Sequence, residues 1–368
     1  MNFNIRTLIL LFLSVFTFSA QGQIEKLKPG FDKKQYIEML KITARQVDTP
    51  WTKVTVPFPE KFQFVYRSKV IGLDNQWDLW LSKDSIAVIS LRGTTADQTS
   101  WLANFYAGMV PAAGKLELEK NFTFEYHLAD NPKAAVHIGW LVGMAYLQRD
   151  ILPKIDSCYN KLGIRNFIIM GHSQGGAIAY MLTSHLENLK QQHKLPTDIR
   201  FKTYCSAAPK PGNLYYAYDY ENLTRNGWAY NVVNAADWVP ETPFSIQTVN
   251  DFNTVNPFTN AKRIIKKQKF PVSMVLNHIY KQMDKPTKKS QRTFEKYLGK
   301  KAYTLLKKKL PEFKQPVYIK SSNYVRTGVT IVLLPDADYY KKYPDDNKVI
   351  FSHHFPEPYL YLAEKLKE

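Results

Sequence analysis

The chain has 368 residues, 45% of them hydrophobic, with 16 glycines and 21 prolines. This is the composition of a globular protein with a large core, and no internal repeat or low-complexity segment is visible along the chain. The net charge of +18 is unevenly placed, because residues 251–320 hold 18 Lys or Arg against 4 Asp or Glu. Most of the positive excess therefore belongs to one segment.

Residues 1–22 have the pattern of a secretory signal peptide. Arg6 precedes an apolar run, and small residues follow at Ala20 and Gly22. We expect cleavage after Gly22, or alternatively after Ala20, and hence a secreted or periplasmic mature chain of residues 23–368. The apolar run is too short to span a bilayer comfortably, so a retained N-terminal anchor is the less favoured alternative.

Strand-like and helix-like runs alternate along most of the chain. Runs rich in β-branched and aromatic residues predict strands, and apolar residues at helical spacing predict helices. Such alternation predicts an α/β fold with a mostly parallel central sheet and helices on both faces. The expected helices lie at 34–47, 137–159, 176–191, 214–226 and 358–368, and the expected strands at 62–70, 76–81, 86–91, from 166 onward, 201–207, 228–234 and 329–334.

The basic segment interrupts this alternation. Residues 258–315 contain two Lys-rich helical stretches, which we expect to be separated near Pro286. We therefore predict a single α/β domain over 23–368 with a basic helical insertion at about 255–318. Lys-rich helices are most often solvated surfaces, but lysines interleaved with apolar residues also suit an anionic membrane surface.

The sequence GHSQG places Ser173 between Gly171 and Gly175, after an apolar run and before a helical one. This pattern is typical of a nucleophile elbow, in which a strand turns sharply into a helix and holds a serine in a strained conformation. Backbone N–H groups at the start of that helix are free to face negative charge. We therefore expect Ser173 to be a nucleophile at the carboxyl end of a sheet strand.

A nucleophilic serine needs a histidine to take its proton and an acid to orient that histidine. In this fold class the expected chain order is serine, acid, histidine. His353 and His354 lie in a loop after the last expected strand, where this order requires the base. The residue pattern alone does not choose between these two histidines.

Three aspartates are candidates for the acid. Asp237 follows the strand expected at 228–234, whereas Asp336 and Asp338 follow the last expected strand. Aspartates in such positions more often form turns or cap helices. The residue pattern therefore gives Asp237 only a modest lead over its two rivals.

An apolar patch follows the strand expected at 86–91. Trp101, Leu102, Phe105 and Tyr106 have the spacing of a short amphipathic helix. One interpretation of this helix is that it belongs to the core. The other is that it forms a mobile cover, a possible lid, over an apolar site.

Several motifs follow one another along the chain. They are RGT at 92–94 with WLAN at 101–104, VHIGW at 136–140, GHSQGG at 171–176, APKPGN at 208–213 and NAADWVPETP at 234–243. In this order they resemble the motifs of the class 3 lipase family, the fungal-lipase-like branch of the α/β-hydrolases. The resemblance extends roughly over residues 60–250 and 320–365, and several motifs in order are far more specific than one.

This resemblance implies an α/β-hydrolase fold with Asp237 as the acid. It also favours His354 as the base, because family members commonly place the histidine five residues before a tyrosine, here Tyr359. The implied oxyanion hole consists of the backbone N–H groups of Thr94 and Gln174. Physical reasoning also favours the second group, since it directly follows the nucleophile.

The sequence departs from the family at two positions. Asn104 replaces the usual aspartate, and Asn234 replaces the usual histidine. These changes bear on a salt link near the lid and on local pH behaviour, but not on the triad. The basic insertion has no counterpart that we can match.

The implied function is a secreted serine carboxylic ester hydrolase that acts on lipid esters, like a triacylglycerol lipase, through an acyl-enzyme. A phospholipase A1 and a feruloyl-type esterase are alternatives on the same fold. A catalytically inactive α/β-hydrolase that serves as a binding protein is an alternative of another class.

We expect no cofactor or metal, and no nucleic-acid partner because an aromatic and basic binding module is not visible. Peripheral contact with an anionic membrane through the basic insertion is a further expectation.

Two cysteines, Cys158 and Cys205, are compatible either with one disulfide in an oxidising compartment or with two buried free thiols. Neither lies in a metal-ligand spacing.

Overall fold

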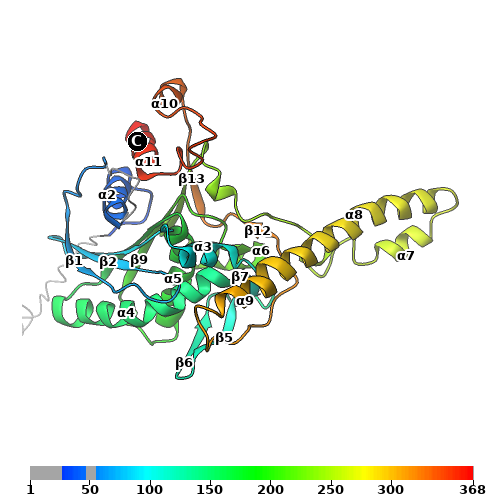
Figure 1. Cartoon of the computed structure of the whole chain (residues 1–368), viewed down its shortest axis with the longest axis horizontal. Helices are drawn as coiled ribbons and strands as arrows, with labels where there is room; N and C mark the ends of the chain where they lie inside the picture. The colour runs from blue at the N-terminus through cyan, green and yellow to red at the C-terminus, as the bar shows by residue number, and fades with distance from the viewer. Residues whose placement is uncertain (1–26, 47–54, 368) are drawn as a thin grey trace, which may run out of the picture.

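A computed structural model describes residues 27–46 and 55–367 of the chain (Figure 1). Its centre is a seven-stranded sheet in the order β1-β2-β3-β8-β9-β11-β13. Strands β1 to β3 pair antiparallel, and β3 to β13 pair parallel, so the predicted mostly parallel sheet is confirmed. The strands are β1 (Phe62–Arg67), β2 (Trp77–Ser82), β3 (Ile86–Leu91), β8 (Asn166–His172), β9 (Arg200–Ser206), β11 (Ala229–Asn234) and β13 (Val329–Leu333).

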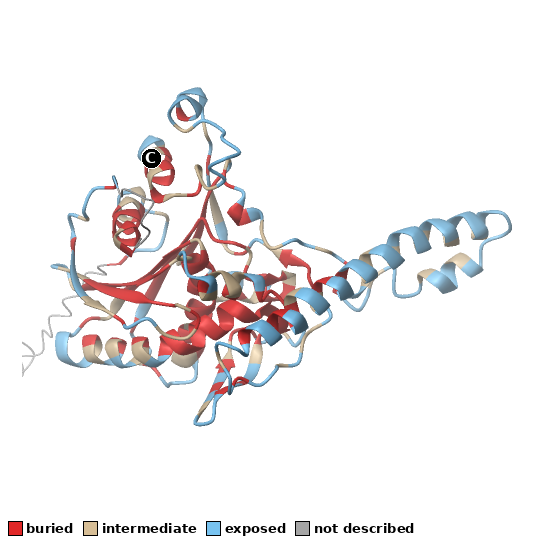
Figure 2. Cartoon of the chain, viewed as in Figure 1, coloured by how far each residue is buried: buried red, intermediate tan, exposed pale blue. Residues whose placement is uncertain are grey.

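Alternating side chains of the central strands build one core on each face of the sheet. In β3, Ala87 and Ile89 belong to the larger core, whereas Val88 belongs to the other. In β8, Ile169 and Ile168 divide between the two cores in the same way. Both faces of these strands are therefore buried (Figure 2), which explains why the strands are nearly continuous apolar runs in the sequence.

Helices cover both faces of the sheet (Figure 1). Polar side chains begin two of them: Asp32 accepts from the N–H of Gln35, and Asn213 accepts from that of Tyr216. The expected helices are confirmed, with ends displaced by a few residues. α2 (Lys33–Thr43) and α11 (Pro356–Lys365) pack together on one face, and α4 (Ile138–Leu162), α5 (Gln174–Gln191) and α6 (Leu214–Leu223) lie on the other.

Short strands between residues 109 and 137 are absent from the sequence prediction. In the structure, β5 and β6 form a hairpin, and β4 and β7 join a second, four-stranded sheet. Leu116 and Phe124 pair across the hairpin and reach the larger core. Alternation of apolar and polar residues over 115–126 is the signal that identifies these strands. The strands of the hairpin and of the second sheet are β4 (Met109–Pro111), β5 (Ala113–Glu119), β6 (Phe122–His127), β7 (Ala135–His137), β10 (Gly212–Asn213) and β12 (Tyr324–Val325).

The basic segment forms a long projection, which we call the arm (residues 261–294; Figure 1). α7 (Ala261–Lys266) and α8 (Val272–Phe294) contact each other and extend away from the sheet. Within the fully described stretch 252–290, no residue is buried (Figure 2). At its base, α8 continues into the π-helix η4 (Glu295–Lys301) and then α9 (Ala302–Leu306). We propose that this region is an insertion in a single domain.

The expected break near Pro286 is wrong. α8 runs through this proline, and the two helices of the arm separate instead before Pro271. A proline inside a helix leaves one carbonyl without its N–H donor. The freed carbonyl is that of Gln282, and this part of α8 is exposed, so water reaches it.

Two further expectations concern the termini and the cysteines. The signal peptide expected over residues 1–22 lies outside the described residues and stays a proposal. In the part of the chain that the structure describes, no helix has both the length and the apolar character needed to span a membrane. Cys158 and Cys205 are both buried free thiols, which agrees with the second of their two interpretations.

A tight contact between α4 and the residues that end at Tyr106 generates a stability prediction. A Cβ on Gly139 would lie 2.0 Å from the carbonyl oxygen of Ala103, whereas a Cβ on buried Gly299 would meet its nearest atom at 3.4 Å. We expect Gly139→Ala to lower the free energy of unfolding by about 1–3 kcal/mol, because backbone must move. Gly299→Ala is the control, with a smaller expected loss. Equal losses in urea unfolding would contradict the assigned contact.

Candidate active site

Ser173 lies at the sharp turn between β8 and α5. Its backbone has φ 60° and ψ −130°, a conformation that costs free energy in a residue other than glycine. A Cβ on Gly171 would lie 2.1 Å from the carbonyl oxygen of Gly175, and a Cβ on Gly175 would lie 2.2 Å from that of Leu91. Glycine at both positions therefore allows α5 to begin this close to β3 and β8.

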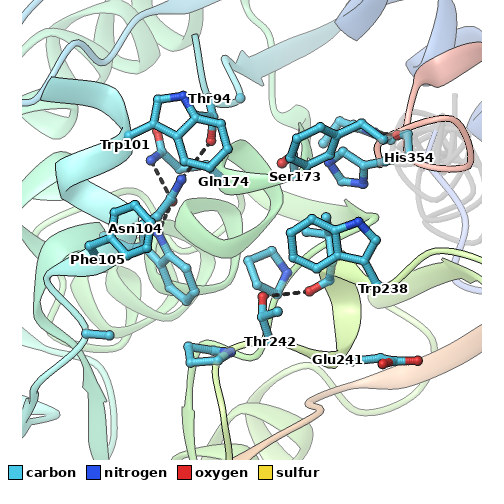
Figure 3. Close-up of a pocket in the computed structure, with 18 of the residues that line it drawn as sticks. Thr94, Trp101, Asn104, Phe105, Ser173, Gln174, Trp238, Glu241, Thr242 and His354 are labelled. Atoms are coloured by element: carbon cyan, nitrogen blue, oxygen red, sulfur yellow. Dashed lines mark hydrogen bonds between the residues drawn. The ribbon is translucent and has the colours of Figure 1, made fainter. Parts of the chain in front are cut away.

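The structure brings His354 and Asp237 together and places His354 in the same cavity as Ser173 (Figure 3). Nδ1 of His354 lies 2.7 Å from Oδ2 of Asp237. Because a carboxylate only accepts, Nδ1 carries the hydrogen and Nε2 presents its lone pair. The Tyr359 hydroxyl donates to the same oxygen at 2.8 Å, and the N–H of Val239 donates to Oδ1 at 3.0 Å. Three donors thus orient the buried carboxylate.

The rival histidine, His353, has other partners. Its Nδ1 pairs with the Tyr339 hydroxyl at 2.8 Å, and its Nε2 lies 2.9 Å from the Asp345 carboxylate. The side-chain amide of Asn234 donates to the carbonyl of His353 at 3.0 Å. Asn234, which replaces the family's usual histidine, therefore holds the loop that carries both histidines.

The rival aspartates have the more common structural roles. Asp336 caps the helix α10 (Ala337–Lys342) and forms an ion pair with Lys365 at 2.9 Å. Asp338 pairs with Lys341 at 3.0 Å on the same short helix. Neither carboxylate contacts either histidine among the interactions of the described residues. The geometry therefore favours Asp237.

A buried chain of hydrogen bonds holds the backbone of His354. Nε2 of His172 lies 2.6 Å from the carbonyl oxygen of His354, so Nε2 donates and Nδ1 accepts from the Ser206 hydroxyl at 3.0 Å. The Ser206 oxygen in turn accepts from the Tyr36 hydroxyl at 2.7 Å. Burial, with a smaller effect of His354, lowers the pKa of His172 to about 3. The His172 ring is therefore neutral near neutral pH, as this chain requires.

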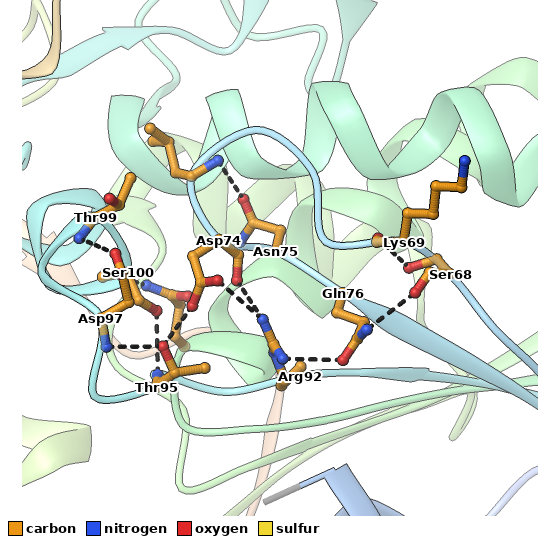
Figure 4. A network of polar contacts seen from close by, with 12 residues as sticks. Ser68, Lys69, Asp74, Asn75, Gln76, Arg92, Thr95, Asp97, Thr99 and Ser100 are labelled. Carbon is orange, nitrogen blue, oxygen red and sulfur yellow. Dashed lines mark hydrogen bonds and ion pairs between the residues drawn. The ribbon is translucent and has the colours of Figure 1, made fainter. Parts of the chain in front are cut away.

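The loop after β3 carries Thr94, and a polar network anchors it to residues 74–76 (Figure 4). The Arg92 guanidinium donates to the Gln76 side chain and to the carbonyl of Asp74, both at 2.9 Å. The Thr95 hydroxyl donates to the Asp74 carboxylate. These contacts fix the residues on either side of Gly93 and Thr94, and hence the position of the Thr94 backbone.

Asn104 links the two residues of the expected oxyanion hole (Figure 3). Its Nδ2 donates to the Thr94 hydroxyl oxygen at 2.9 Å, and its Oδ1 accepts from Nε2 of Gln174 at 2.8 Å. Oδ1 also accepts from the Trp140 indole at 2.9 Å. Gln174 begins α5, so its backbone N–H has no acceptor within the helix. The amide of Asn104 thus positions both residues from the side of α3 (Gln98–Phe105).

Ser173 and His354 open into a cavity of about 740 Å³. Large aromatic side chains dominate its walls, so the space suits an apolar ligand more than a charged one. Among the described residues, no group of three His, Cys, Asp or Glu is placed to hold a metal ion. The aromatic lining residues are Trp101, Phe105, Trp140, Trp238, Phe244, Phe294, Phe351 and Phe355.

The possible lid residues divide between two environments. Trp101 and Phe105 line the cavity, and Phe105 is 57% exposed. Leu102 packs against the larger core, and Tyr106 is fully buried with its hydroxyl 2.9 Å from that of Tyr318. In this structure Leu102 and Tyr106 therefore anchor the end of α3, whereas Trp101 and Phe105 face the cavity. The possible lid over these four residues stays a proposal.

Sequence reasoning missed several residues of the site. His172 is adjacent to the nucleophile, and a polar residue at the end of a buried strand is a local signal for it. The aromatic residues Trp238, Phe294 and Phe351 come from three distant segments. The rings of Trp238 and Phe351 are centred 5.3 Å apart, and those of Phe351 and His354 5.8 Å apart. Only the tertiary structure brings them together.

Residues 88–247 match the sequence model of one protein family, described as lipase (class 3). The matched segment contains the elbow, the Thr94 loop and Asp237, and it ends before the arm and His354. A search of curated proteins gives no match.

Solved structures similar to this chain include fungal lipases. A Rhizomucor miehei lipase complexed with its propeptide has 17% sequence identity and a TM-score of 0.42, and the match covers 59% of this chain and 65% of that chain. The Lip2 lipase of Yarrowia lipolytica has 18% identity and a TM-score of 0.42, with 59% and 76% covered. A Rhizopus microsporus lipase has 20% identity and a TM-score of 0.40, with 58% and 69% covered. At TM-scores this low, the likeness carries no conclusion about this chain.

The buried, neutral His172 predicts acid sensitivity. Its pKa is about 3 in the folded chain against 6.5 ordinarily, so between these values only the unfolded chain takes up the proton. The free energy of unfolding should therefore fall as the pH falls below 6.5, by up to about 1.4 kcal/mol per pH unit from this residue. His172→Gln, which keeps a donor and an acceptor but does not titrate, should flatten the dependence. Exposed His278→Gln is the control, and equal slopes for both variants would refute the assignment.

Proposed function

We propose, from the premise that this chain belongs through residues 88–247 to the class 3 lipase family, that it hydrolyses carboxylic esters of lipids through an acyl-enzyme on Ser173. One observation carries this proposal. His354, oriented by the Asp237 carboxylate at 2.7 Å, shares an apolar cavity with a serine at a strained strand-to-helix turn. Along the chain the proposed nucleophile comes first, then the acid, then the base, which is the order that α/β-hydrolases use.

In the proposed reaction, the Ser173 oxygen attacks the ester carbonyl carbon while Nε2 of His354 takes the hydroxyl proton. The protonated ring then gives this proton to the leaving alcohol oxygen as the ester C–O bond breaks. A water molecule attacks the acyl-enzyme, again with His354 as base, and releases the carboxylic acid and free Ser173. Asp237 keeps the hydrogen on Nδ1 and stabilises the imidazolium.

Backbone N–H groups of Thr94 and Gln174 would stabilise the oxyanion that forms on the carbonyl oxygen. Such donors are effective only where they are held in place before the reaction. The amide of Asn104 supports this role, because it bonds to both side chains and is itself fixed by Trp140.

The size and lining of the cavity support lipid esters as the substrate class. Its aromatic walls suit an acyl chain, and exposed side chains stand at its rim, with Phe244 82% and Trp238 41% exposed. A triacylglycerol-like substrate fits this apolar space. A phospholipase A1 activity is the second candidate, favoured by the positive charge of the arm. A feruloyl-type esterase would prefer aryl esters, and an inactive binding protein would need no base beside Ser173.

We also propose that the protein is secreted or periplasmic and makes peripheral contact with an anionic membrane. The expected signal peptide supports the first part. The exposed positive charge of the basic insertion supports the second, since clustered lysines are attracted to anionic lipid surfaces.

Ser173→Ala tests the proposed function directly. We expect the purified variant to hydrolyse short-chain, triacylglycerol, phospholipid and aryl esters at least about 1000-fold more slowly than wild type. It should also no longer be labelled by a fluorophosphonate. His354→Ala should lose activity to a similar extent. His353→Ala is the matched control and should keep most of it. Wild-type rates of hydrolysis in Ser173→Ala would refute the proposal. If His353→Ala alone lost activity and His354→Ala kept it, the role of base would pass to His353.

Asn104→Ala tests the positioning of the oxyanion hole. We expect kcat for a soluble ester to fall about 10- to 100-fold with little change in KM, because the donors matter most in the transition state. Asn104→Asp should restore most of the activity, since a carboxylate accepts from Gln174, Trp140 and the Thr94 hydroxyl. A folded Asn104→Ala protein with wild-type kcat would contradict this role.

A further inference from the structure

The helix α8 presents an apolar stripe to solvent along the arm. Val272, Leu276, Ile279 and Met283 recur every three to four residues and therefore lie on one helix face. Their side chains are 50%, 39%, 52% and 68% exposed, respectively. A contiguous apolar stripe of this kind has a cost in water, and it marks a surface that another apolar phase covers.

Basic residues occupy the opposite face of the same helix. Lys281, Lys285 and Arg292 lie about half a turn away from the apolar stripe. Residues 261–301 together hold 13 Lys or Arg against 2 Asp or Glu. A helix that is apolar on one face and strongly basic on the other is suited to lie in the plane of an anionic lipid surface.

The stripe continues into the wall of the candidate active site. Phe294 follows Met283 by eleven residues, which is close to three helical turns, so it lies on the same face. It is buried at the base of the arm and lines the cavity, as does Leu298 of η4. A single helical element thus connects the exposed apolar face of the arm with the space that Ser173 and His354 share.

We propose that the arm inserts the apolar face of α8 into an anionic phospholipid bilayer and so holds the cavity at that surface. This inference rests on the proposed function, to which it adds the helix face that enters the membrane and the link from that face to the cavity. The hydrophobic stripe enters the acyl boundary, while lysine stems extend along the helix and keep their ammonium groups at the headgroups. A helix with one apolar and one basic face lies in the plane of the surface, so the proposed attachment is peripheral.

Charge and apolar exposure together select a bilayer as the occupant. A nucleic acid would use the basic face but leave the apolar stripe in water. A neutral lipid droplet would cover the stripe but make no use of the excess positive charge, which adds attraction only at an anionic surface. An anionic bilayer satisfies both features at once.

Two methionines on opposite faces of α8 provide a matched test. Met283 lies in the stripe, and Met274 lies nine residues earlier, about two and a half turns away and hence on the opposite side. Their exposed fractions are similar, 68% and 57%. Met283→Glu and Met274→Glu make the same chemical change and the same change of net charge, so they differ only in the face that they alter.

The experiment measures sedimentation of the full-length chain with phosphatidylcholine vesicles and with vesicles that also contain phosphatidylglycerol. Ser173→Ala is present in every protein, so hydrolysis does not alter the vesicles. We expect binding only to the anionic vesicles, weakened by salt, weakened about tenfold by Met283→Glu and less than about twofold by Met274→Glu. A tryptophan or a fluorescent probe introduced at position 276 would then report insertion, because lipid quenches its fluorescence when the helix face enters the bilayer.

Three outcomes would overturn the inference: equal effects of the two substitutions, equal binding to both vesicle types, or tighter binding to RNA than to anionic vesicles. A soluble short-chain ester, assayed with active Met283→Glu protein, separates this inference from the proposed function. If Met283→Glu leaves turnover of that ester unchanged, and if Met283→Glu and Met274→Glu bind anionic vesicles equally, the arm is rejected as a membrane anchor and the proposed hydrolase stands.

Discussion

The candidate site depends on one steric constraint, the close approach of α5 to the ends of β3 and β8. With a Cβ on Gly175 only 2.2 Å from the Leu91 carbonyl oxygen, no other residue permits this approach. The approach sets the strained backbone of Ser173 and brings the start of α5 beside the Thr94 loop. The nucleophile and both proposed oxyanion donors therefore derive their positions from the packing of backbone against backbone.

Polar side chains complete what the backbone begins, and each is fixed by more than one partner. Asp237 accepts from His354, Tyr359 and Val239, and Asn104 bonds to Thr94, Gln174 and Trp140. Buried polar groups need such partners, since an unpaired one would cost more than the bond contributes. These multiple contacts keep Asp237 and Asn104 rigid on the sheet side, while the exposed aromatic residues at the cavity rim are free to meet a substrate.

The central sheet could be predicted from the sequence because its signals are local. The proposed triad needed the family resemblance as well, because the residue pattern alone did not choose Asp237 and His354 over their rivals. Apolar strands alternate with helices, and the elbow glycines, Asp237 and His354 lie within ordered motifs. The hairpin of β5 and β6 also had a local signal, the alternation over 115–126, that was not used. The path of α8 through Pro286 was mispredicted because the cost of a proline depends on whether water reaches the freed carbonyl. His172 has a local signal, but its partners, the role of Asn104 and the burial of Tyr106 depend on tertiary contacts that no local pattern contains.

The chain of hydrogen bonds from Tyr36 to His354 joins the first described helix to the candidate site. Tyr36 lies in that helix, and Tyr359, which holds Asp237, lies in the last described helix. The two helices also bond directly, from Nζ of Lys33 to the carbonyl of Leu366 at 2.6 Å. The proposed base therefore depends on contacts between segments that are far apart in the sequence. Loosening α2 from α11 would disturb the support of His354 without touching any residue of the cavity wall.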